Sequence, residues 1–97
     1  MKKRIIFFDA NLSVVPAIKY AKSRGFHVIT CDNKPQNPGH KEADEALMIS
    51  TYDLDLIDKY VDNNPVDGVV YFASSHGAYA GCHIIEKWKL PGIPESI

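Results

Sequence analysis

Apolar residues fall into four short runs along this chain, separated by segments of helical spacing or by polar stretches. The first run, Arg4 to Asp9, is continuous and ends in an acid, which is typical of a strand buried on both faces. Similar runs cover residues 26–32, 46–49 and 66–73. Because each run has the length of a strand, the pattern predicts a four-stranded sheet.

Helical spacing follows the first and third runs. A first helix is expected with Ser13 as its N-cap, Pro16 in its first turn and Gly25 as a left-handed C-cap. Either Thr51 or Asp53 can cap a second helix, in which apolar residues recur every three or four positions. Each of these helices therefore connects one expected strand to the next.

A third helix is expected after the fourth run, beginning at Ser74 or Ser75. The polar stretch of residues 33–44 contains two prolines and a glycine, and we expect a loop there with one helical turn. Strands that alternate with helices predict a parallel sheet with right-handed crossovers. The fold class expected for residues 1–97 is a single α/β, three-layer Rossmann-like domain, with a mainly parallel sheet in the order 3-2-1-4 and helices on both faces.

Composition and charge limit the kinds of binding partner expected for this chain. With 97 residues, the chain is small for a complete metabolic enzyme. Eleven basic and twelve acidic residues give a net charge of −1, which argues against nucleic acid and membrane surfaces as partners. No apolar run approaches the roughly 20 residues of a membrane span. Cys31 and Cys82 lack CxxC spacing and are expected as reduced thiols, which indicates a cytoplasmic protein.

A candidate substrate site follows from the expected strand order. Open parallel sheets bind ligands beyond the carboxyl ends of their strands, where the strand order reverses. That point lies between the loop of residues 10–13 and the loop of residues 73–76. Both loops lead into helix N-termini, which favour a carboxylate or phosphate. The candidate substrate-binding residues are Asn11, Ser13, Ser74, Ser75 and His76. The alternative is that the serines only cap helices.

Other motifs predict no catalytic, cofactor-binding or metal-binding residue in this chain. No glycine follows the first strand to admit a dinucleotide, and Asp32 alone is weak evidence for a ribose site. The segment Asp9 to Asn11 resembles the DxD motif of haloacid-dehalogenase-like phosphotransferases, but Asn11 cannot protonate a leaving group. Cys82 and His83 lie on different faces of the expected helix. Met48 is expected in the core.

A longer series of segments resembles the N-terminal domain that precedes the ATP-binding module of ATP-grasp ligases. The resemblance is closest to the carbamoyl-phosphate synthase large subunit, with carboxyaminoimidazole ribonucleotide synthetase and biotin carboxylase as broader relatives. It is carried, in order, by Ala17-Ile18, Ala21-Lys22, Gly25-Phe26, Val28, Asp32, Asn37-Pro38-Gly39, Ala43-Asp44-Glu45, Ser50-Thr51-Tyr52-Asp53, Asp67-Gly68-Val69-Val70 and Leu90-Pro91-Gly92-Ile93-Pro94. Where many family members have a glycine-rich turn after the first strand, this chain has Ala10-Asn11-Leu12-Ser13.

The resemblance implies a role within a larger enzyme. Such ligases use ATP and magnesium to activate a carboxylate as an acyl phosphate, which an amine then attacks. Their first domain supplies substrate-side surface, and the residues that hold ATP and magnesium lie downstream. The chain is therefore expected to be a non-catalytic fragment of an ATP-dependent carboxylate–amine ligase, partnered by a downstream ATP-grasp domain of the same chain.

Two other functions stay open at this stage. A stand-alone nucleotide- or ligand-binding module would use the same crevice without chemistry. A structural interaction domain would dock a partner through an exposed apolar patch, for which Trp88 is the candidate.

Overall fold

Four parallel strands form one sheet in the computed structural model, which describes residues 2–71, 75–88 and 90, with the backbone alone for residues 75–79. The strands are β1 (Arg4–Phe8), β2 (His27–Cys31), β3 (Glu45–Leu47) and β4 (Gly68–Val70). They pair in the order β3-β2-β1-β4. The predicted strand order is confirmed.

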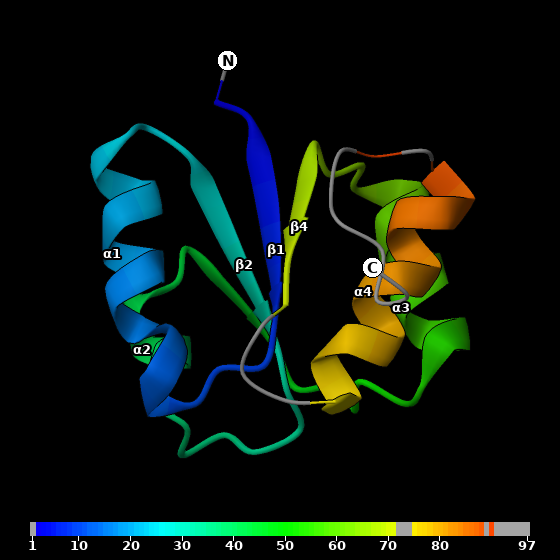
Figure 1. The fold of residues 1–97 in the computed structure, drawn as a ribbon, viewed down its shortest axis with the longest axis horizontal. Helices are drawn as coiled ribbons and strands as arrows, with labels where there is room; N and C mark the ends of the chain where they lie inside the picture. Colours follow the sequence, from blue (N-terminus) through cyan, green and yellow to red (C-terminus); the bar gives the residue numbers. More distant parts are fainter. Residues whose placement is uncertain (1, 72–74, 89, 91–97) are drawn as a thin grey trace.

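Helices cover both faces of this sheet, as Figure 1 shows. The short 3₁₀ turn η1 (Leu12–Val14) leads into α1 (Val15–Ser23), which lies with α2 (Gly39–Glu42) on one face. On the other face lie α3 (Leu54–Asn63) and α4 (Ser75–Trp88). The three-layer Rossmann-like class is confirmed. Among the described residues, no helix is long and apolar enough to cross a membrane.

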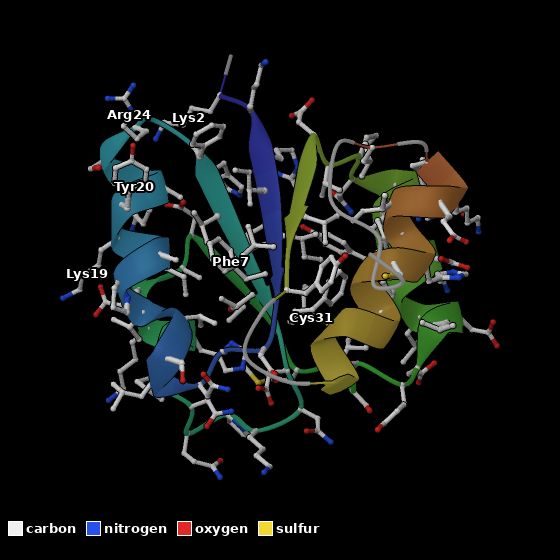
Figure 2. All side chains as sticks on the ribbon, viewed as in Figure 1. Lys2, Phe7, Lys19, Tyr20, Arg24 and Cys31 are labelled. Carbon is white, nitrogen blue, oxygen red and sulfur yellow. The ribbon has the colours of Figure 1, made fainter. Side chains whose placement is uncertain are left out.

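The central strand β1 supplies side chains to two separate cores. Phe7 packs with the buried residues of α1, and Figure 2 shows its side chain between the sheet and that helix. Ile6 and Phe8 point the other way and pack with buried residues of α3 and α4. All three side chains are almost fully buried. This alternation explains the continuous apolar run in the sequence, because a parallel strand between two helical layers has no polar face.

The ends of the helices follow the sequence with one correction. The side chain of Asn11, and not that of Ser13, caps the first turn, since Asn11 Oδ1 accepts the Ser13 N–H at 3.0 Å. This capped turn is η1, which precedes α1, so the chain enters α1 without a second side-chain cap. Gly25 has a φ of 86° and is the left-handed residue expected after α1. Asp53 caps α3 by accepting the Leu56 N–H.

The exposure of two apolar side chains, Met48 and Trp88, can be compared with what the sequence predicted. Met48 is 48% exposed, so its assignment to the core was wrong. It follows a three-residue edge strand, where the alternation of buried and exposed positions no longer constrains it. Trp88 is partly buried against the core formed by α3 and α4, with the Lys87 ammonium 4.6 Å from its ring centre. Trp88 itself is therefore not the exposed side chain that a docking role predicted.

A polar network joins the amino ends of the strands. Glu45 Oε2 accepts hydrogen bonds from Arg4 Nη2 at 3.1 Å and Tyr60 Oη at 3.1 Å, and lies 2.7 Å from His27 Nε2. Arg4 Nη2 also lies 2.6 Å from Tyr60 Oη. Burial alone would raise the pKa of Glu45, but hydrogen bonds from His27 and Tyr60 and the charge of Arg4 lower it below its ordinary value. The network thus connects β1, β2, β3 and α3 at the edge opposite the candidate site.

Glu45 should therefore make stability depend on pH in the acid range. Because the pKa of its carboxyl is lower in the folded chain, its contribution is present above the ordinary value of 4.5 and is lost as the pH falls through the lower folded value. At about pH 7, Glu45→Gln should reduce the free energy of unfolding by about 1 kcal/mol or less, because solvent screens the partly exposed pairs. Urea unfolding of both proteins between about pH 7 and pH 3 should show this difference shrinking.

Glu86→Gln is the matched control, since its exposed carboxylate has no ion pair within the described part of the chain. A difference between the wild type and Glu45→Gln that stays constant with pH would contradict the stabilising network.

The first turn of α2 is pressed against the end of β1. Gly39 N–H donates to the Ala10 carbonyl at 2.7 Å. A Cβ on Gly39 would lie 2.7 Å from Ala10 O and 2.9 Å from Ala10 Cα, both backbone atoms that a side-chain movement cannot clear. The glycine is thus required for close approach of two segments that are far apart in sequence.

Gly39→Ala should destabilise the domain by about 1–3 kcal/mol, because the added methyl group overpacks the contact with Ala10. Urea unfolding would measure the change. Gly68→Ala is the control, since its Cβ would meet only Ile5 Cγ1 at 3.8 Å, an ordinary contact. Equal stability of the two variants would show that the approach of α2 to β1 is not tight.

Candidate functional site

A polar cavity of about 400 Å³ opens at the carboxyl edge of the sheet. Three loops line it: the one after β1, the one between β2 and α2, and the one between β3 and α3. This is the edge at which open parallel sheets bind ligands. The lining residues are Asp9, Asn11, Asp32, Asn33, Lys34, Asn37, Ser50, Thr51 and Tyr52.

The carboxylate of Asp32 joins two of these loops. Its Oδ2 accepts the Ala10 N–H at 3.1 Å and the Asn37 side-chain amide at 2.8 Å. Its Oδ1 accepts the Lys34 N–H at 2.9 Å. Asp32 itself is only 6% exposed. These bonds occupy the carboxylate, so Asp32 organises the cavity and is not placed to hold a ribose as an acid in a dinucleotide site would.

The electrostatics of the cavity floor follow from this arrangement. Burial would raise the pKa of Asp32, but hydrogen bonds from the Lys34 and Ala10 amides, and from the Asn37 and Asp9 side chains, lower it. Burial, together with the charges of Asp32 and Asp9, raises the pKa of the neighbouring Cys31 thiol to about 12. Cys31 therefore remains a neutral thiol at physiological pH and is not a nucleophile.

Asp9 has an unusual backbone conformation at the end of β1. Its φ is 110°, a value that glycine adopts easily and other residues rarely adopt. Its N–H still donates to the Cys31 carbonyl at 3.2 Å, so the sheet holds the backbone in place.

Of the residues predicted to form the site, some line the cavity and others do not. Asn11 lines the cavity. Ser13 is exposed in η1 and is not among the lining residues. Ser75 and His76 lie in the first turn of α4, but their side chains fall outside the described part of the structure, as does all of Ser74. The crevice predicted between the β1 and β4 loops therefore stays a prediction.

Most residues of this cavity were not predicted from the sequence. The predicted site lay between the loops after β1 and β4, whereas the cavity lies between the loops after β1, β2 and β3. Asp9 and the segment Ser50 to Tyr52 follow strand ends, a signal that could have identified them as lining residues. Asp32, Asn37 and Ser50 to Tyr52 also belong to the segments that carried the family resemblance. No group of three or more potential metal ligands occurs among the residues that the structure describes.

Comparison with known proteins adds evidence on the fold. No protein-family model and no curated protein matches this sequence. Phosphoribosylglycinamide synthetase from Anaerococcus prevotii is 24% identical, with a TM-score of 0.83 over 98% of this chain and 24% of that one. N5-carboxyaminoimidazole ribonucleotide synthetase from Thermotoga maritima is 22% identical, with a TM-score of 0.72 over 88% and 23%. L-amino acid ligase from Bacillus licheniformis is 17% identical, with a TM-score of 0.77 over 96% and 24%.

A UDP-glucose 4-epimerase from Thermotoga maritima also matches, with a TM-score of 0.72 at 13% identity over 90% of this chain and 35% of that one. The structural similarities therefore establish the fold and not the activity. The chain spans about a quarter of the length of the three ligases and synthetases. In those structures the matching part is the N-terminal domain. This chain therefore has the fold of the N-terminal domain of ATP-grasp ligases.

Proposed function

We propose that this chain is the non-catalytic, substrate-side N-terminal domain of an ATP-dependent ligase that joins a carboxylate to an amine. The observation that carries the proposal is the match over 98% of the chain to a quarter of a synthetase, with a polar cavity at the carboxyl edge of the matching sheet. The ordered sequence segments favour a parent enzyme similar to the carbamoyl-phosphate synthase large subunit. We also propose a cytoplasmic location, on the evidence of its two cysteines.

The chemistry of the cavity supports a role in binding substrate and not in activating it. Among the lining residues that the structure describes, Lys34 is the one cation, and two carboxylates oppose it. A nucleotide triphosphate with magnesium needs several cationic or backbone N–H groups around its phosphates. In this proposal, ATP and magnesium bind to a downstream domain of the same polypeptide. The present domain forms one wall of the site in which the activated carboxylate meets the amine.

A stand-alone ligand-binding module is the second candidate. The cavity would serve it equally well, and the similarity to a sugar-nucleotide epimerase shows that this fold occurs outside ligases. The two candidates differ in what the native polypeptide contains.

The isolated chain should show no saturable binding of Mg·ATP by calorimetry, because the cavity offers a triphosphate little positive charge. An antibody raised against this chain should detect a native polypeptide several times larger in extracts of the source cells. That polypeptide, captured by the same antibody, should bind Mg·ATP. The isolated chain is the matched control, since it differs only in lacking the remaining sequence.

A native polypeptide of the size of this chain would contradict the ligase and leave the ligand-binding module. Saturable binding of Mg·ATP by the isolated chain would contradict the assignment of the nucleotide to another domain.

A further inference from the structure

The described residues that line the cavity at the carboxyl edge all have polar or charged side chains. Six of these nine described residues carry side-chain amides or hydroxyls, which suit a ligand with several hydroxyl groups. These six are Asn11, Asn33, Asn37, Ser50, Thr51 and Tyr52. The charged groups are Asp9, Asp32 and Lys34, so acids outnumber bases.

Two carboxyl groups meet on the floor of this cavity. The side chains of Asp9 and Asp32 both line the cavity and interact with one another, which places two acids side by side. Their negative potential also reaches the thiol of Cys31, whose pKa burial and these two charges raise. The floor therefore favours a cation over a carboxylate or phosphate.

Of the two acids, Asp9 is the one able to contact a ligand. Asp32 is 6% exposed, and its oxygens already accept two backbone amides and the Asn37 side chain. Asp9 lines the same cavity from a φ of 110°, a conformation that is strained for a residue with a side chain. Glycine would adopt this conformation without that cost. A carboxylate kept at a strained position beside a cavity indicates a binding role.

We propose that this cavity binds a polyhydroxylated primary amine, with the ammonium group at the Asp9 carboxylate and the hydroxyl groups on the surrounding amides and hydroxyls. A divalent metal ion is less well served, because the described residues place no third His, Cys, Asp or Glu side chain beside the two carboxyls. The proposal rests on the proposed ligase function, within which the ligand is the amine substrate.

Three probes that share a polyhydroxylated chain and differ in the charge of one terminal group distinguish the effect of charge on binding from that of shape. Glucamine ends in an ammonium group, sorbitol in a hydroxyl and gluconate in a carboxylate. Each would be titrated into the ¹⁵N-labelled chain at about pH 7, with the amide signals of the cavity loops as the readout. Glucamine should bind about tenfold more tightly than sorbitol, as one charge-assisted hydrogen bond provides, and gluconate should bind more weakly than sorbitol.

Two substitutions at Asp9 test the assignment of the ammonium. Asp9→Asn keeps the shape of the side chain and should reduce glucamine binding to the level of sorbitol. Asp9→Gly should lose the same preference while the chain remains at least as stable in urea, since glycine relieves the strain at this position. The second variant shows that any loss of binding does not come from unfolding.

Several results would overturn the inference. These are gluconate binding as tightly as glucamine, a preference for glucamine that persists in Asp9→Asn, or no signal change with any of the three probes. The fate of the ligase proposal is separate. A small native polypeptide with a preference for glucamine would contradict the ligase proposal and support the amine site. A large native polypeptide that binds Mg·ATP but has no such preference would support the ligase proposal and contradict the amine site.

Discussion

The buried carboxylate of Asp32 is the group on which the candidate site depends. It lies at the end of β2 and accepts backbone amides from the β1 loop and from its own loop, together with the Asn37 side chain. A buried charge is stable only when its hydrogen-bonding capacity is used. These bonds fix two loops relative to each other across 22 residues of sequence, and the cavity forms between them.

The packing of α2 supports the same arrangement. Gly39 contacts the Ala10 backbone directly, and the Asn37 side chain donates a hydrogen bond to Asp32. Both ends of the segment 37–39 are therefore fixed to the loops around the cavity. With Ala10 fully buried, the β1 loop has little freedom to move away from β2. Asp9 immediately before it is then fixed at a positive φ, with its side chain at the cavity. The loop after β1 thus places the acidic side chain of Asp9 at the cavity.

Much of the fold could be predicted from the sequence because its signals are local. The apolar runs gave the strands, and Gly25 and Asp53 mark helix boundaries by their own backbone and side-chain chemistry. The first cap was harder, since Asn11 and Ser13 are both good capping residues and the path of the chain leaving β1 decides between them.

The side of β1 on which the cavity opens could not be predicted. It depends on hydrogen bonds between Asp32 and the distant Ala10, which no local pattern contains. The positive φ of Asp9 is equally hidden, because the sequence has an aspartate where such a conformation normally indicates glycine. Residues that bind ligands are often those whose conformation the rest of the fold imposes.

Amide hydrogen exchange of the isolated chain, measured residue by residue, tests the organising role of Asp32 most directly. The Ala10 and Lys34 amides should exchange slowly in the wild type and much faster in Asp32→Asn. The Val28 amide, which donates to Asp44 at 2.8 Å, should be unchanged in that variant. Unchanged protection of Ala10 and Lys34 in Asp32→Asn would contradict the account, because the loops around the cavity would then be held by something other than this carboxylate.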